Sequence, residues 1–106
     1  MKVREMLEMI DSTKKNEVED GVKIRWINDV ESKVFCDVLK KRPEDFCGVE
    51  GEECLLSLPD AYARVYLLYV WAMIELAEGH GSDYSALKQC FESELSAYAR
   101  SVIRNR

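Results

Sequence analysis

The sequence has little of what loop-rich, metal-binding or membrane-spanning proteins need. Its 106 residues include only 5 glycines, 2 prolines and 1 histidine, and its 4 cysteines form no CxxC pair. Few glycines and prolines argue against a disordered chain, and a lone histidine beside scattered cysteines lacks the spacing of a metal site. The apolar segment 65–74 is too short to cross a bilayer, which needs about 20 residues. We therefore expect no metal, cofactor or membrane contact.

The composition that is present indicates one folded domain over residues 1–106. Hydrophobic residues make up 47% of the chain and charged residues 33%, as in globular proteins, and a chain of this length supports one core. The net charge of -5 repels a phosphate backbone, so DNA binding is not expected. The charged start, Met1 to Glu5, lacks the apolar core of a secretion signal, which predicts a protein made and kept in the cytoplasm.

The four cysteines are expected to be free thiols, because the cytoplasm keeps cysteine reduced. Cys36 and Cys90 fall within predicted helices, where we expect small buried groups. A disulfide between Cys47 and Cys54 stays open for an oxidising setting, since sequence spacing does not establish disulfide geometry.

Apolar residues at helical spacing predict two helices in the first half of the chain. A first amphipathic helix is expected over residues 3–13. The positions on its apolar face are Val3, Met6, Leu7 and Ile10. Asn16 followed by Glu19 resembles a capping box, so a second helix is expected from there to about residue 41, because Pro43 disfavours helical geometry in the residue before it.

Residues 43–58 have no sustained apolar period and are strongly acidic, which predicts a long loop that is either functional or mobile. A third helix is expected from Pro59 to Ala77, with Ser57 or Asp60 capping its first amides. This helix is apolar on nearly every side, which predicts a position at the centre of the structure.

Glycines at 79 and 81 are expected to end the third helix, and Ser82 or Asp83 to cap a fourth. The fourth helix carries an apolar seam that predicts packing on a partner helix. The seam residues are Tyr84, Leu87, Phe91, Leu95, Tyr98 and Val102. The short turn favours an antiparallel hairpin. The predicted fold is all-α, with four helices, a long acidic loop between the second and third, and a hairpin of the third and fourth.

Candidate catalytic residues are few. Glu5 with Glu8, and Glu17 with Asp20, resemble the carboxylate pairs with which all-helical nucleotide pyrophosphatases hold Mg²⁺. The pairs are too close along the chain to lie on facing helices, so solvated helix faces are the favoured interpretation. His80 lies in a glycine turn with no nucleophile paired to it, which predicts a solvent-facing turn residue. We expect no enzymatic activity.

Three segments of the chain resemble one protein family, and they are WINDVESKV (26–34), LSLPDAY (56–62) and VYLLYVWAMI (65–74). The fourth predicted helix, from Tyr84 to Arg100, is similar to the same family. This chain resembles the small head-tail adaptor, or connector, proteins of tailed bacteriophages and prophages. The resemblance covers nearly the whole chain in the right order, and the acidic loop from Glu44 to Cys54 departs from it.

The resemblance implies a virion protein at the head-tail junction, made in the cytoplasm of a bacterial host. About a dozen copies would form a ring beneath the portal, linking it to the next head-closure or tail protein. Double-stranded DNA would pass through the channel without specific binding. The partners implied are therefore copies of the chain itself, the portal and a stopper or tail protein.

We assign three groups of residues to these contacts. The portal contact is assigned to Arg100, Arg104 and Arg106. The ring or tail-side contact is assigned to Glu44, Asp45, Phe46, Glu50, Glu52 and Glu53. Surplus apolar surface on the third helix predicts a packing or oligomer face. That face comprises Tyr62, Tyr66, Tyr69, Trp71 and Met73.

Two other functions stay open from the sequence. A small cytoplasmic helical regulator or adaptor that acts as a dimer fits the same composition. A Mg²⁺-dependent nucleotide pyrophosphatase is the enzyme alternative, and it depends on the acidic pairs described above.

Overall fold

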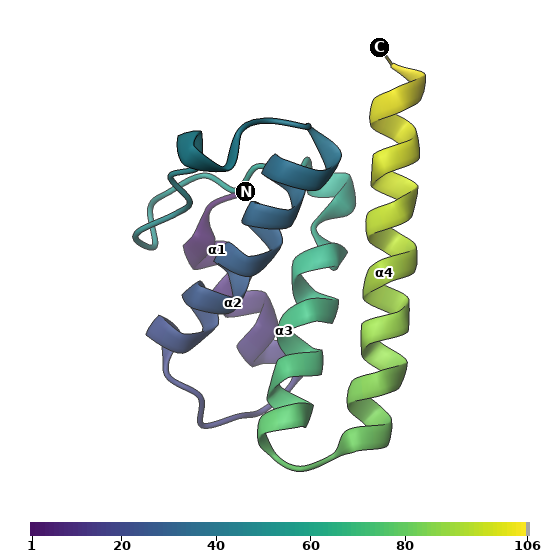
Figure 1. The fold of residues 1–106 in the computed structure, drawn as a ribbon. Coiled ribbons are helices and arrows are strands. Elements are labelled where there is room, and N and C mark those ends of the chain that lie inside the picture. The colour runs from purple at the N-terminus through teal and green to yellow at the C-terminus, as the bar shows by residue number, and fades with distance from the viewer. Residues whose placement is uncertain (106) are drawn as a thin grey trace.

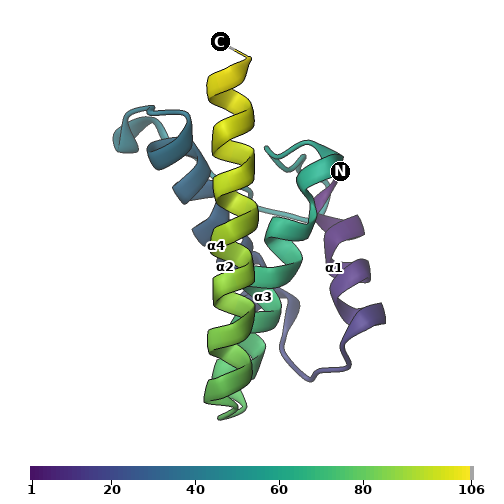
Figure 2. The ribbon, with the colours of Figure 1, turned by 90° about the vertical axis from the view of Figure 1, so that its right-hand side faces the viewer.

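Helix α3 (Arg64–Ala77) lies at the centre of the molecule, as its apolar sequence predicts. The computed structural model describes residues 1–105, in which α1 (Val3–Thr13), α2 (Asp20–Lys33) and α4 (Gly81–Arg104) pack around α3 (Figure 1, Figure 2). The buried residues of α3 are Val65, Tyr66, Leu67, Leu68, Val70, Ala72, Ile74 and Glu75. The expected all-α, four-helix, single-domain fold is confirmed. Within residues 1–105, no helix combines the length and the apolar character that a membrane span requires.

Helices α3 and α4 form the expected antiparallel hairpin (Figure 1). Phe91 and Tyr98 of α4 are buried. Their rings meet those of Tyr69 and Tyr62 edge-on, with centroids 5.0 and 5.1 Å apart, a favoured aromatic arrangement. The other seam residues are partly buried, and they are Tyr84, Leu87, Leu95 and Val102. The spacing of the apolar residues along α4 therefore predicted correctly which of its faces packs on α3.

The turn between α3 and α4 is closed by backbone geometry. Gly79 has a φ of +83°, the left-handed conformation that favours glycine, and the N–H of His80 donates to the carbonyl of Glu75 at 2.8 Å. No side chain caps α4, so the expected cap by Ser82 or Asp83 is wrong. Both residues lie inside the first turn of α4, because Gly79 already redirects the chain before them.

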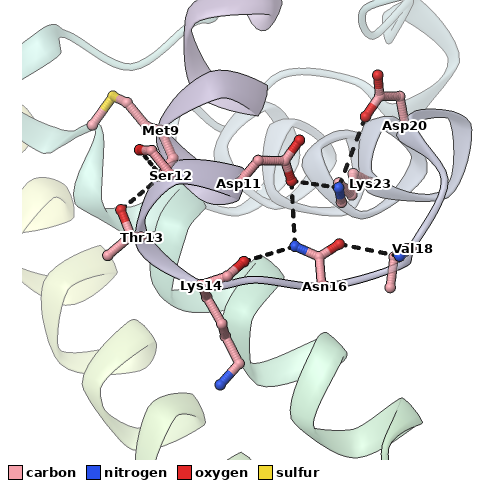
Figure 3. A network of polar contacts seen from close by, with 9 residues as sticks. All are labelled: Met9, Asp11, Ser12, Thr13, Lys14, Asn16, Val18, Asp20 and Lys23. Carbon is pink, nitrogen blue, oxygen red and sulfur yellow. Dashed lines mark hydrogen bonds and ion pairs between the residues drawn. The ribbon is translucent and has the colours of Figure 1, made fainter.

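Helix α1 has its predicted bounds, whereas α2 begins at Asp20 and not at Asn16. The Asn16 side chain accepts a hydrogen bond from the N–H of Val18 at 3.1 Å and donates to the carbonyl of Lys14 at 2.9 Å (Figure 3). These bonds order the linker, and Glu19 precedes α2 without a side-chain cap. The expected capping box is wrong, because asparagine can satisfy a turn as well as a helix start.

Helix α2 continues into a single turn of π-helix, η1 (Val34–Val38), and helical structure ends close to the predicted residue 41. The N–H of Leu39 donates to the carbonyl of Val34 at 2.9 Å, five residues back. Lys40 has a φ of +57°, which stops the helix three residues before Pro43. Single π-turns are uncommon and occur frequently at functional sites.

Residues 43–58 form the expected long connection, and its later part is held against the start of α1. The N–H of Val3 donates to the carbonyl of Cys54 at 3.0 Å, and the N–H of Leu56 donates to the carbonyl of Met1 at 2.9 Å. The connection opens with a short 3-10 turn, η2 (Pro43–Asp45), and a second one, η3 (Asp60–Tyr62), follows it. Backbone hydrogen bonds therefore fix the position of the loop that the sequence leaves open.

The start of α3 lacks the expected side-chain caps. Ser57 donates from its N–H and its hydroxyl to Glu31, at 3.0 and 2.6 Å. The carboxylate of Asp60 accepts from the terminal amine of Met1 at 3.0 Å. The expected caps by Ser57 and Asp60 are both wrong. Ser57 bonds the buried carboxylate of Glu31, and Asp60 bonds the terminal amine of Met1.

Candidate functional site

A pocket of about 230 Å³ lies between η1 and the segment 45–57. We call it the loop pocket. Its apolar wall comprises Val34, Phe35, Leu39, Phe46, Val49 and Leu55, and its other lining residues are Glu31, Asp45, Cys47, Gly48 and Ser57. Apolar walls with a few polar groups are typical of binding sites. The two carboxylates give this one a negative character.

The carboxylate of Glu31, which is only 3% exposed, belongs to the lining of the loop pocket. It accepts three hydrogen bonds, two from Ser57 and one from the hydroxyl of Tyr66. The Tyr66 oxygen in turn accepts from the N–H of Leu58 at 3.1 Å. Burial, together with this hydrogen bond to Glu31, raises the pKa of Tyr66 well above its ordinary value. These contacts fix the carboxylate in the lining of the pocket.

The far wall of the loop pocket is held by an amide side chain. Asn28 accepts from the N–H of Val49 and donates to its carbonyl, each at 2.8 Å. Gly48 has a φ of +70°, and a Cβ there would lie 2.5 Å from the Asn28 side-chain oxygen. The rings of Phe35 and Phe46, both in the pocket lining, pack at an angle of 59° with centroids 5.5 Å apart. These contacts hold the loop against α2 and η1.

The six loop residues assigned to partner contact do not form one cluster. Asp45 and Phe46 line the loop pocket, and the remaining four are exposed outside its lining. Two of these carboxylates are paired within the chain, Glu53 with Lys2 and Arg4, and Glu44 with Arg42. The hydrogen bond from Lys2 is the main cause that lowers the pKa of Glu53, and a backbone hydrogen bond, then Arg42, lowers the pKa of Glu44. Among the ion pairs of residues 1–105, Glu50 and Glu52 take no part in such a pairing.

Leu55 is the most exposed large apolar residue of the chain over residues 1–105, at 71%. It stands in the lining of the loop pocket while its backbone bridges to Lys2 at the start of α1. Nothing in the pattern of residues around Leu55 indicates its exposure. Its side chain extends the apolar wall of the loop pocket to the surface, where a partner can reach it.

The carboxyl end of α4 forms the second surface, which we call the α4 end and define as Arg100, Ile103 and Arg104. All three are exposed, Ile103 at 65%. At about 100° per residue they share one face, opposite the buried Phe91 and Tyr98. Figure 1 and Figure 2 show the last turns of α4 standing clear of the other helices. Arg106, the third assigned arginine, lies outside the described residues.

The predicted face on α3 is largely used within the chain. Tyr66 is fully buried in the core, while Tyr62, Tyr69, Trp71 and Met73 are partly buried. Tyr62 and Tyr69 pack on α4, and the hydroxyl of Tyr69 donates to Asp29 at 3.0 Å. The surplus apolar surface that the sequence indicates on the third helix is therefore covered in part by α4 of the same chain.

The polar side chains at the opposite end of the molecule form two structural networks. Buried Lys23 contacts Asp11 at 2.6 Å and Asp20 at 3.8 Å, which joins α2 to the end of α1 (Figure 3). Buried Glu75 pairs with Lys14, and with the Nδ1 of His80 at 2.6 Å. His80 is exposed as expected, yet it is tied to α3, which its sequence position does not indicate.

Among residues 1–105, one group of three potential metal ligands lies within 4.8 Å of one another, namely Glu75, Glu78 and His80. The carboxylate of Glu75 already has two partners, as described above. The four acidic residues that resemble a pyrophosphatase site belong to no such group. They are Glu5, Glu8, Glu17 and Asp20.

The four cysteines are unpaired thiols. Cys47 is exposed in the lining of the loop pocket, and Cys36 and Cys54 are partly buried. Cys90 is exposed, so the expected burial of Cys90 is wrong. It precedes the buried Phe91 by one residue, and one residue turns the side chain about 100° away from the seam.

Sequence reasoning missed the buried polar residues, although a signal for two of them was present. Lys23 and Glu31 lie four residues before and after Ile27, which places both on the apolar stripe of α2. A charged residue on such a stripe is buried and needs a partner. The identity of the partner could not be read, because Ser57 and Tyr66 are far away along the chain.

No family model, curated protein or solved structure matches this chain.

Proposed function

We propose that this chain is a structural adaptor that joins other protein subunits, and that it works in the head-tail connector of a tailed bacteriophage or prophage. One observation carries the proposal. A single helical frame presents two unlike exposed surfaces, an acidic apolar pocket with Leu55 beside it and a basic apolar α4 end with Ile103 on it. An adaptor needs at least two docking surfaces, because it must hold two partners at once.

The state of the buried ionisable groups supports a binding role. Lys23, Glu31 and Glu75 are each paired within the chain in contacts that join helices or hold a loop. Groups held in this way are poor acids, bases or nucleophiles, since reaction would break the contacts that keep them buried. The separation of the two acidic pairs from any ligand cluster in residues 1–105 weakens the pyrophosphatase alternative.

In the proposed role the protein is made in the host cytoplasm and joins the virion at the head-tail junction. About a dozen copies surround the DNA channel beneath the portal. The α4 end contacts the portal, and the loop contacts a neighbouring copy or the tail-side protein. The net charge of -5 favours free passage of DNA, because few phosphate contacts form.

The portal protein encoded in the same genome provides the test. The full chain should bind it and give annular particles in electron micrographs. A chain ending at Ala99 should retain its helicity and lose binding, because it lacks the whole α4 end. A matched control replaces two exposed cations elsewhere, Lys15→Ala with Arg25→Ala, and should bind normally.

Each other outcome counts against part of the proposal. Unchanged binding of the shortened chain overturns the portal contact at the α4 end. A dimer that persists at all concentrations and ignores the portal overturns the connector and favours the regulator. Mg²⁺-dependent nucleotide hydrolysis that disappears with Glu5→Gln and Glu8→Gln overturns the non-enzymatic role.

A further inference from the structure

We infer that the α4 end of one copy docks into the loop pocket of a second copy. The two surfaces are complementary in charge, since Arg100 and Arg104 are cationic and the exposed carboxylate of Asp45 lines the pocket. They are also complementary in polarity, since Ile103 is an exposed aliphatic side chain and the pocket wall is apolar. The occupant is therefore a second copy of this chain.

The size and shape of the two surfaces fit this contact. Ile103 lies beside Arg100 and Arg104, which are one helical turn apart, so it can enter the pocket while the guanidinium groups stay at its edge. A volume of about 230 Å³ accommodates one aliphatic side chain with room for its neighbours. The Phe35 ring of the pocket lining contacts a cation within its own chain, since the ammonium of Lys41 lies 5.5 Å from the centre of the ring.

A chain cannot fill its own loop pocket. Phe91 and Tyr98 hold α4 along α3, and the last turns of α4 stand clear of η1 and the loop in both views (Figure 1, Figure 2). The contact is thus between copies and joins unlike surfaces. Such contacts close into a ring, run on as a chain, or are exchanged reciprocally in a dimer.

Self-association through the α4 end covers the two most exposed apolar residues of the described chain, Leu55 and Ile103. This part of the inference stands without the portal. A second consequence rests on the proposed function: the portal and the loop pocket compete for one α4 end, so free copies associate with each other until a portal is present.

Two single variants and their mixture test the contact in purified protein. Ile103→Asp places a negative charge in the α4 end and leaves the loop pocket unchanged. Leu55→Lys places a positive charge at the loop pocket and leaves the α4 end unchanged. Both positions are exposed, so helicity measured by circular dichroism should not change. In sedimentation equilibrium each variant alone should self-associate at least about tenfold more weakly than the natural chain. Their equimolar mixture should form a one-to-one complex and grow no further.

A disulfide test reports the geometry directly, because Cys47 lies in the pocket lining. In a background carrying Cys36→Ser, Cys54→Ser and Cys90→Ser, the change Ile103→Cys should give a disulfide between copies under mild oxidation, joining the introduced thiol to Cys47. The matched control is Ser93→Cys, exposed on the face of α4 that carries Arg100 and nearly three turns before Ile103. It should remain largely uncrosslinked.

Three results would overturn the inference. They are a natural chain that is monomeric at every concentration, a mixture of variants that fails to associate, and equal crosslinking from positions 93 and 103. A chain that stays monomeric and still binds the portal would overturn the contact between copies and support the adaptor role. A chain that self-associates but does not bind the portal would support the contact between copies and overturn the portal-binding role.

Discussion

The hydroxyl of Tyr66 donates a hydrogen bond to the carboxylate of Glu31, 35 residues earlier in the chain, and both side chains are buried. This contact joins α3 to α2. Because the same carboxylate also holds Ser57, the end of the acidic loop is fixed to the core through one residue. The lining of the loop pocket therefore depends on a hydrogen-bond network inside the fold.

Replacing Tyr66 with phenylalanine should destabilise the protein. Tyr66→Phe leaves the N–H of Leu58 without its acceptor and removes one donor from buried Glu31, which costs about 1–3 kcal/mol. The matched control is Tyr69→Phe, whose hydroxyl bonds exposed Asp29 and should cost less than about 1 kcal/mol. Urea denaturation measures both. Equal losses would mean that the buried network adds nothing beyond an ordinary surface hydrogen bond.

The buried ammonium of Lys23 lies closer to the carboxylate of Asp11 than to that of Asp20. Asp11→Asn removes the carboxylate at 2.6 Å and should lower the free energy of unfolding by about 1–3 kcal/mol, because it leaves a buried ammonium without its nearest counter-charge. Asp20→Asn, at 3.8 Å, should cost less than about 1 kcal/mol. Thermal or urea unfolding decides the order. A larger loss from Asp20→Asn would contradict the geometry of the α1–α2 linker.

The two glycines at the α3–α4 turn should respond in opposite directions to the same change. A Cβ at Gly79 or at Gly81 would meet nothing within 4 Å, so only the backbone conformation differs. Gly79→Ala forces alanine into a left-handed conformation and should cost about 1–2 kcal/mol. Gly81→Ala lies in the first turn of α4 and should gain about 0.4–1 kcal/mol. Calorimetric melting temperatures should move apart, and a shift in the same direction would refute this account of the turn.

The sequence was sufficient to predict the helices whose apolar residues recur at helical spacing. Helix α1 and the α4 seam depend on local patterns, so their positions could be inferred without knowing their partners. The start of α2 could not be inferred in this way, because an asparagine such as Asn16 can hydrogen-bond within a turn as well as cap a helix. The capping errors at Ser57 and Asp60 have the same origin, since both side chains bind groups far away in the sequence.

The candidate surfaces were only partly predictable. The arginines of α4 could be placed on one helix face from their spacing, and Asp45 and Phe46 of the assigned loop line the loop pocket. The loop pocket itself arises where η1 meets a loop held by Asn28 and Glu31, so tertiary contacts create it. Leu55 had no sequence signal, because exposure of a single leucine depends on which residues happen to cover it.

Alkaline conditions should weaken the contact between α3 and α2 through Tyr69. Burial is the main cause that raises the pKa of Tyr69 to about 12, helped by the hydrogen bond to Asp29 and its charge. The unfolded chain loses this proton near pH 10, its ordinary pKa, so the stabilisation is fully present below pH 10 and is lost as pH rises towards 12. Tyr69→Phe should therefore show a shallower loss of unfolding free energy across that window than the natural chain, measured by urea titrations at several pH values. Asp29→Asn keeps the phenol but removes the charged acceptor, and should also make the loss shallower. An identical slope in all three proteins would show that Asp29 has no influence on the phenol.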